Sequence, residues 1–161
     1  MKNVILTAFL ILAGYSCLFA QMESVSIYNP DANAREDIAK AVQQAKAENK
    51  QVLLQIGGNW CPWCVKLHAL EAEDHEIDSL LNADYVRVMV NVPREKDKRD
   101  YELLATLENP QRFGFPVLVV LNQEGKRIHT QDSWYLEKDK DYDLEKLVQF
   151  FKMWTVKAVK G

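Results

Sequence analysis

Residues 51–64 read QVLLQIGGNWCPWC, where an apolar run leads through two glycines to a pair of cysteines two residues apart. The apolar run predicts a buried strand, and Pro62 is typical of the first turn of a helix. Cys61 and Cys64 are therefore expected one turn apart where a strand meets a helix. Helix N-terminal amides favour a thiolate, so this stretch predicts a site of thiol–disulfide exchange.

Residues 1–20 have the pattern of a secretory signal, with Lys2, an apolar core and a small residue, Ala20, before a cut ahead of Gln21. An uncleaved membrane anchor is the alternative, although the apolar stretch is shorter than the roughly 20 residues of a span. Lipidation of Cys17 is a further alternative, but Gly14 stands where a lipoprotein signal normally has an aliphatic residue. We expect an exported protein, periplasmic or secreted, whose only membrane contact would be an uncleaved signal.

The cysteine count favours a chemical role for the pair. The chain has three cysteines, and removal of residues 1–20 takes Cys17 with it. Exported proteins generally use cysteines as structural staples between distant segments. A chain that keeps only two neighbouring cysteines cannot form such a structural disulfide, so the pair is expected to take part in thiol–disulfide exchange.

Composition indicates an ordinary globular domain. Hydrophobic residues make up 48% of the chain and charged residues 27%. The formal net charge of −3 argues against a nucleic-acid partner. The length fits one domain, which we place at residues 34–161, after a linker or short strand over residues 21–33.

Helical and strand-like periodicities alternate along the rest of the chain, which is typical of an α/β layer fold. Besides the strand at Gln51–Ile56, the expected elements are a short strand at Ser24–Tyr28, a helix from an Asp31 or Asn33 cap to Glu48, helices at Pro62–Glu73 and Glu76–Leu81, a central strand at Tyr85–Val92, a helix at Lys98–Leu107, a hairpin of Val117–Leu121 and Lys126–Thr130, and a last helix from an Asp143 cap through Trp154.

With these features the chain resembles the thioredoxin superfamily, in particular the exported thioredoxin-like proteins with a Trp-Cys-x-x-Cys motif. The likeness rests on residues 60–64 after a buried strand, on Gly114-Phe115-Pro116 before a hairpin, and on the final amphipathic helix. It covers about Ala34 to Val156. The resemblance implies a thioredoxin-like three-layer α/β/α sandwich with a mixed central sheet.

The resemblance also implies a cis Phe115–Pro116 bond that brings the backbone of Phe115 beside Cys61. An extended substrate segment could then pair with this edge by strand addition. Cys61 lies nearer the helix start and is expected to be the nucleophile, with Cys64 as the resolving cysteine. The expected substrate contacts are Trp60, Pro62, Trp63, Phe115 and Pro116, with Trp63 in an exposed turn.

The sequence thus predicts an exported thiol–disulfide oxidoreductase that acts as a monomer on protein thiols and disulfides and meets a redox partner protein. It needs no cofactor beyond its own disulfide, and the direction of electron flow stays open. One residue departs from the thioredoxin pattern. Gln55 stands six positions before Cys61, where thioredoxins carry an acid that assists proton transfer at the resolving thiol. An amide cannot take up a proton near neutral pH.

Two other functions are weighed against this one. Cys61, Cys64 and His68 have a spacing that could hold copper or zinc, but a structural zinc site usually needs a fourth ligand and none is evident. Haem attachment is excluded because Val65 stands where that motif requires histidine. A non-catalytic interaction module would be expected to have lost a cysteine, and both are present.

Overall fold

A computed structural model describes residues 26–161 of the chain. The expectations for residues 1–20, for Cys17 and for residues 21–25 fall outside the described residues. Within them, the motif lies where expected. Strand β1 (Gln51–Gly57) is buried along its whole length and leads through a short turn into helix α2 (Pro62–Glu73).

Four strands form one mixed sheet in the order β2-β1-β3-β4. Strand β1 pairs in parallel with β2 (Tyr85–Asn91) and antiparallel with β3 (Val117–Leu121), which forms a hairpin with β4 (Arg127–Asp132). In this register Gln55 lies between Met89 and Leu118. Gln55, the residue six positions before Cys61, therefore lies in the middle of the sheet with a strand on each side.

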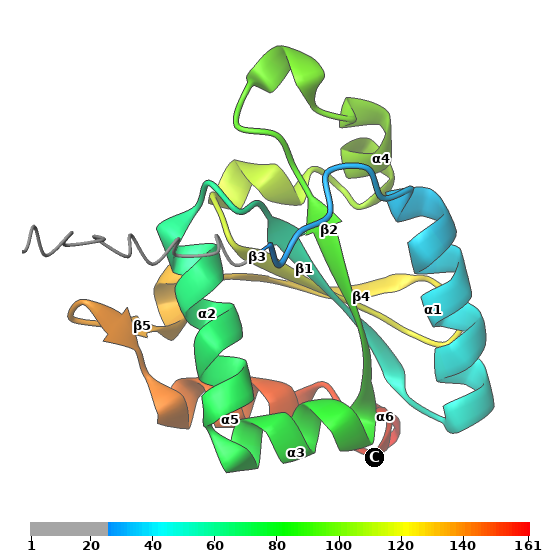
Figure 1. The fold of residues 1–161 in the computed structure, drawn as a ribbon. Coiled ribbons are helices and arrows are strands. Elements are labelled where there is room, and N and C mark those ends of the chain that lie inside the picture. The colour runs from blue at the N-terminus through cyan, green and yellow to red at the C-terminus, as the bar shows by residue number, and fades with distance from the viewer. Residues whose placement is uncertain (1–25) are drawn as a thin grey trace, which may run out of the picture.

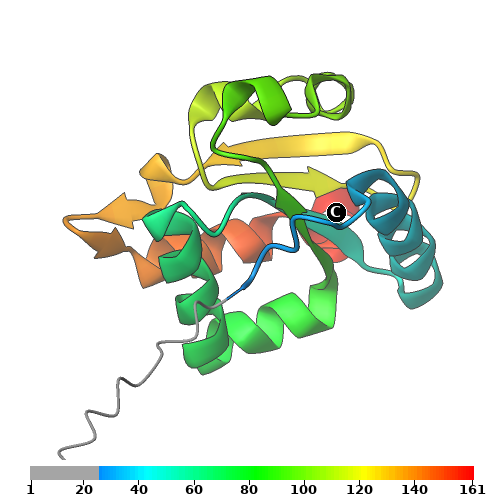
Figure 2. The same ribbon diagram turned by 45° about the horizontal axis from the view of Figure 1, so that its top comes forward.

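Helices cover both faces of the sheet (Figures 1 and 2). Helices α1 (Ala34–Glu48) and α4 (Tyr101–Thr106) pack on one face, against alternate residues of β1 such as Leu54 and Ile56. Helices α2, α3 (His75–Asp84) and α5 (Leu144–Met153) pack on the other face, which includes Leu53 and Val120. The predicted thioredoxin-like α/β/α sandwich with a mixed sheet is confirmed.

Short elements complete the fold. They are the 3-10 helices η1 (Lys96–Lys98), η2 (Pro110–Phe113) and η3 (Trp134–Leu136), the two-residue strands β5 (Glu137–Lys138) and β6 (Asp141–Tyr142), and the C-terminal helix α6 (Val156–Lys160). In the described part of the chain, no helix is both long enough and apolar enough to cross a membrane.

Among residues 26–161, β2 is an edge strand of the sheet, so the prediction of a central strand at Tyr85–Val92 was wrong. Its valines alternate because Val86, Val88 and Val90 all face the α1 side. Alternation reports which face of a strand is covered by apolar packing. It does not report whether the strand has a neighbour on both edges.

The short first strand is also absent from residues 26–28. The backbone amides of Ile27 and Tyr28 each donate a hydrogen bond to Oδ1 of Asn59, at 2.9 Å. Nδ2 of Asn59 donates to the Tyr28 carbonyl at 2.7 Å. One side chain thus satisfies the backbone groups that a strand neighbour would have satisfied.

Two helix boundaries differ from the predicted ones. The helix expected from Lys98 starts at Tyr101, because the side chain of Asp100 accepts a hydrogen bond from the Leu103 amide and caps it there. The last helix ends at Met153 with Trp154 as its cap, and α6 starts after a Thr155 cap. Both ends are set by local capping that the apolar periodicity does not report.

Candidate active site

The two cysteines are joined by a disulfide at the start of α2. Cys61 is the N-cap residue of this helix, and its Sγ accepts a hydrogen bond from the Cys64 amide at 3.2 Å. Pro62 occupies the first turn, where its missing amide hydrogen leaves nothing unpaired. Cys61 is 4% exposed and Cys64 is fully buried. The cysteine nearer the helix start is thus the one that solvent reaches.

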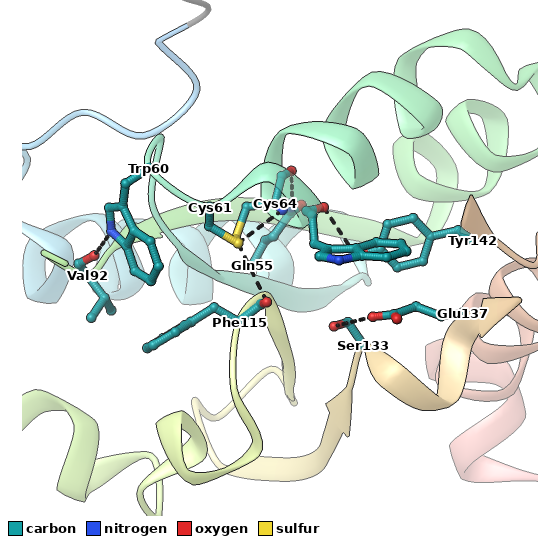
Figure 3. The surroundings of a disulfide bond; sticks show 10 residues. Gln55, Trp60, Cys61, Cys64, Val92, Phe115, Ser133, Glu137 and Tyr142 are labelled. Atoms are coloured by element: carbon teal, nitrogen blue, oxygen red, sulfur yellow. Dashed lines mark hydrogen bonds between the residues drawn. A yellow bond between two sulfur atoms is a disulfide. The ribbon is translucent and has the colours of Figure 1, made fainter. Parts of the chain in front are cut away.

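The loop before β3 lies next to the disulfide (Figure 3). The Phe115–Pro116 bond is cis, as the resemblance implied. The carbonyl oxygen of Phe115 lies 3.5 Å from Sγ of Cys61. The backbone of Phe115 is therefore beside the cysteine that is expected to attack a substrate.

Aromatic side chains flank the disulfide on two sides (Figure 3). On one side, the Trp60 indole donates a hydrogen bond to the Val92 carbonyl at 2.8 Å and meets the Phe115 ring edge-on, with 5.6 Å between ring centroids. On the other side, Trp63 meets Tyr142 edge-on at 5.3 Å. Trp60 remains 37% exposed. These rings leave an apolar surface around the sulfur atoms.

The prediction that Trp63 lies in an exposed turn was wrong. Trp63 lies in the first turn of α2 and is half-buried. The hydroxyl of Tyr142 donates to the Trp63 carbonyl at 3.1 Å. Lys66 holds the same segment, since its Nζ donates to the Lys140 carbonyl and lies 3.7 Å from the Asp141 carboxylate. The β5–β6 hairpin, which sequence reasoning missed, therefore covers one side of Trp63.

Buried polar groups lie beneath the disulfide. Gln55 is 1% exposed, and its Nε2 is 3.5 Å from the Cys64 carbonyl, to which it donates. Tyr28 is fully buried. Its hydroxyl and Sγ of Cys64 both lie within 2.9 Å of the point that a β-carbon on Gly57 would occupy. Burial raises the pKa of Tyr28 above its ordinary value, and the nearby Gln55 side chain partly offsets that rise.

Sequence reasoning missed two buried polar residues, Tyr28 and Glu71. No motif marked Tyr28, because its contact with Cys64 joins segments far apart in the chain. For Glu71 the one sequence signal is its helical spacing from Cys64 and Leu67, and the structure buries all three. Burial raises the pKa of Glu71 to about 8, with Arg87 acting in the opposite direction.

The metal alternative gains no support from the geometry. Across residues 26–161, no group of three or more His, Cys, Asp or Glu side chains is placed to hold a metal ion. His68 is half-buried on α2, and burial, with a smaller contribution from Arg87, lowers its pKa. The two sulfur atoms bond to each other.

Comparison with known proteins places this arrangement among disulfide-exchange proteins. The family model Thioredox_DsbH, described as "Protein of unknown function, DUF255", matches residues 32–158. The "Disulfide bond reductase DsbH" of Chlamydia pneumoniae is 26% identical over 97 residues, which are 58% of this chain and 58% of that protein. The chain thus spans less than two thirds of that relative.

Solved structures agree on the fold. The crystal structure of a disulphide isomerase from Xylella fastidiosa Temecula1 superposes with a TM-score of 0.69 at 26% identity, and covers 79% of this chain and 95% of that one. The oxidised C-terminal domain of DsbD from Neisseria meningitidis gives a TM-score of 0.52 at 17% identity, over 76% and 96% of the two chains. The second likeness concerns the fold alone.

Proposed function

Because the chain belongs to the Thioredox_DsbH family, within the thioredoxin superfamily, we propose that it is an exported thiol–disulfide oxidoreductase that acts on protein substrates through Cys61 and Cys64. The observation that carries this proposal is the position of the disulfide. Sγ of Cys61 sits at the N-terminus of α2 and 3.5 Å from the Phe115 carbonyl. A sulfur in this place combines thiolate stabilisation with a neighbouring backbone edge for substrate.

The exchange proceeds in two steps when the pair starts reduced. The Cys61 thiolate attacks one sulfur of a substrate disulfide, so that a Cys61–substrate disulfide forms and the other substrate sulfur leaves as a thiolate. Cys64 then loses its proton, and its thiolate attacks Sγ of Cys61 and releases the second substrate sulfur. Two electrons pass from the cysteine pair to the substrate. The same steps in reverse oxidise a substrate dithiol.

The roles of the surrounding residues follow from their positions. The amide of Cys64 donates to Sγ of Cys61 at 3.2 Å, which favours the thiolate. Phe115 and Pro116 would pair with an extended substrate segment, and Trp60, Pro62 and Trp63 would contact its side chains. The reaction needs two thiols and no metal or organic cofactor. Both cysteines come from one chain, so the protein is expected to work as a monomer. A redox partner protein is expected to reset its oxidation state.

Export rests on residues 1–20, whose pattern is that of a secretory signal. A periplasmic or secreted protein would meet substrates whose disulfides are stable in an oxidising compartment. The N-terminal residue of the purified exported protein tests this part of the proposal. Gln21 at the N-terminus is the expected result, and Met1 would contradict export with cleavage.

Cysteine variants test the activity. Cys61→Ser is expected to abolish insulin reduction in a turbidity assay with dithiothreitol as reductant, because the attacking thiolate is gone. Cys64→Ser is expected to accumulate mixed disulfides with partner proteins, because nothing resolves them. Cys17→Ser in the full chain is the matched control and should reduce insulin like the parent. Full activity of Cys61→Ser would overturn the assignment of the nucleophile.

A further inference from the structure

Two side chains from other segments of the chain contact the ring of Phe115. This ring lies on the Trp60 side of the disulfide (Figure 3), and the Trp60 indole meets it edge-on at 5.6 Å. The guanidinium carbon of Arg99 lies 5.3 Å from the centre of the same ring. That distance is within the range of a cation–π contact. The residue whose carbonyl lies 3.5 Å from Sγ of Cys61 is therefore in contact with an indole and a cation.

The guanidinium of Arg99 is fixed by the backbone of its own loop. Its Nε donates a hydrogen bond to the Pro93 carbonyl at 2.9 Å, and its Nη2 donates to the Arg94 carbonyl at 3.1 Å. Arg99 is half-buried, whereas Arg94 and Lys98 in the same loop are exposed. Arginine presents its donors in a rigid planar fork and also stacks on aromatic rings. The two hydrogen bonds thus set the position of the cation beside the Phe115 ring.

The same stretch of backbone also holds Trp60. The loop begins where β2 ends, and the Val92 amide donates a hydrogen bond to the Gly57 carbonyl at 2.6 Å, which ties the loop to the end of β1. The Val92 carbonyl accepts a hydrogen bond from the Trp60 indole at 2.8 Å. Three successive carbonyls, at positions 92–94, therefore anchor both side chains that contact the Phe115 ring.

A fixed Phe115 ring bears on substrate binding through the backbone of the same residue. An extended substrate segment would pair with the edge at Phe115, and strand addition of this kind uses main-chain hydrogen bonds. Association is weaker when a loop has to be ordered at the same time, because the lost conformational freedom opposes binding. Contacts that order Phe115 before the substrate arrives therefore favour binding.

We propose that Arg99 is a positioning residue for the exchange reaction, which holds the Phe115 ring and, through it, the substrate-binding edge beside Cys61. This rests on the proposed function. Arg99 acts through Phe115 and takes no part in the transfer of electrons or protons. A protein substrate, which has to pair with the edge, depends on Arg99. A small disulfide that reaches Cys61 without pairing does not.

The test compares a protein disulfide with a small one. The reduced protein is mixed with insulin or with hydroxyethyl disulfide, which is small and uncharged. Oxidation of the Cys61–Cys64 pair is followed by acid quench, alkylation and mass spectrometry. In Arg99→Met the rate constant with insulin is expected to fall about fivefold, which corresponds to about 1 kcal/mol, the usual size of a cation–π contact near a surface. The rate constant with hydroxyethyl disulfide should equal that of the parent.

Arg94→Met is the matched control, because it removes an equal charge from an exposed side chain of the same loop. Both rate constants should keep their parental values in this variant, and a fall equal to that of Arg99→Met would overturn the proposal. Arg99→Lys keeps a cation near the ring but not the planar fork. Its rate constant with insulin should lie between those of the parent and Arg99→Met, which keeps the experiment decisive if Arg99→Met folds poorly.

A double-mutant cycle tests whether Arg99 acts through Phe115. Phe115→Leu removes the ring, so adding Arg99→Met to it should lower the rate constant with insulin no further. Independent losses in the two variants would overturn the proposal, as would a parental rate with insulin in Arg99→Met or an equal fall with both disulfides. A parent that leaves insulin oxidised would contradict the proposed action on protein substrates, and with it this role of Arg99.

Discussion

At the scale of single residues, the absence of a side chain at Gly57 allows the inner part of the site to pack. A β-carbon there would lie 2.5 Å from Sγ of Cys64 and 2.9 Å from the Tyr28 hydroxyl. Neither group can move away easily, because both are fully buried. Glycine at position 57 thus allows the end of β1 to lie directly beneath Cys64, the resolving cysteine.

Gly57→Ala is expected to lower the free energy of unfolding by about 1–3 kcal/mol, the usual cost of overpacking a well-filled interior. It should also speed alkylation of Cys64 in the reduced protein, because Tyr28 must shift. Denaturant unfolding and mass spectrometry of alkylated protein measure both effects.

Gly114→Ala provides the control for Gly57→Ala. Gly114 has φ +88° and no atom within 4 Å of a built β-carbon, so alanine there adds backbone strain without a collision. Cys64 should be alkylated at the parent rate in this control. Parental stability and parental alkylation of Gly57→Ala would contradict the packing account.

At the scale of elements, the helices and strands that were predicted correctly are those with signals in their own local sequence. Helix α1 and the β3–β4 hairpin have caps, turns or apolar spacing within the element itself, and the structure has them close to where they were expected. The edge position of β2 depends on how distant segments pair in the sheet. The β5–β6 hairpin is local, since Glu137 pairs with Tyr142 and Lys138 with Asp141, but its strands are very short. Each strand of that hairpin has two residues, too few for any periodicity.

The same distinction applies to the site. Cys61, Cys64 and Pro116 stand in recognisable motifs, so a single sequence could nominate them. Tyr28 could not be nominated, because only the folded chain brings it to Cys64. Glu71 shares helical spacing with Cys64, but spacing alone does not distinguish a buried carboxyl from an exposed one.

Asn59 fixes the N-terminal segment to the site, and its replacement tests that attachment. Asn59→Ala removes the acceptor for the Ile27 and Tyr28 amides and the donor to the Tyr28 carbonyl. The loss should cost about 1–3 kcal/mol, since backbone groups lose their partners. Hydrogen exchange at the Ile27 and Tyr28 amides should become faster.

Asn29→Ala is the matched control for that experiment, because the Asn29 side chain accepts a hydrogen bond from the amide of Asp31 in the same segment and, in the part of the chain that the structure describes, from no amide of Ile27 or Tyr28. Its exchange at Ile27 and Tyr28 should equal that of the parent. If Asn59→Ala kept the parental protection at these two amides, another contact would have to hold the segment in place.

At the scale of the whole molecule, the sheet separates two different interiors. The side covered by α1 and α4 is an apolar cluster. The side covered by α2 holds apolar side chains too, but also Gln55 and Glu71, below a disulfide at the end of the sheet. Apolar clusters on both faces stabilise the fold. Gln55 and Glu71, by contrast, are buried on the α2 face alone.

The redox equilibrium of the Cys61–Cys64 pair tests the central claim most directly. The protein is equilibrated in glutathione or dithiothreitol buffers of stepped ratio, its thiols are blocked, and the two cysteines are read by mass spectrometry. The account predicts one two-electron transition between the disulfide and two free thiols, at about −270 to −120 mV, the range of thioredoxin-fold exchange proteins. A pair that stays oxidised below about −300 mV, as structural disulfides do, would contradict it.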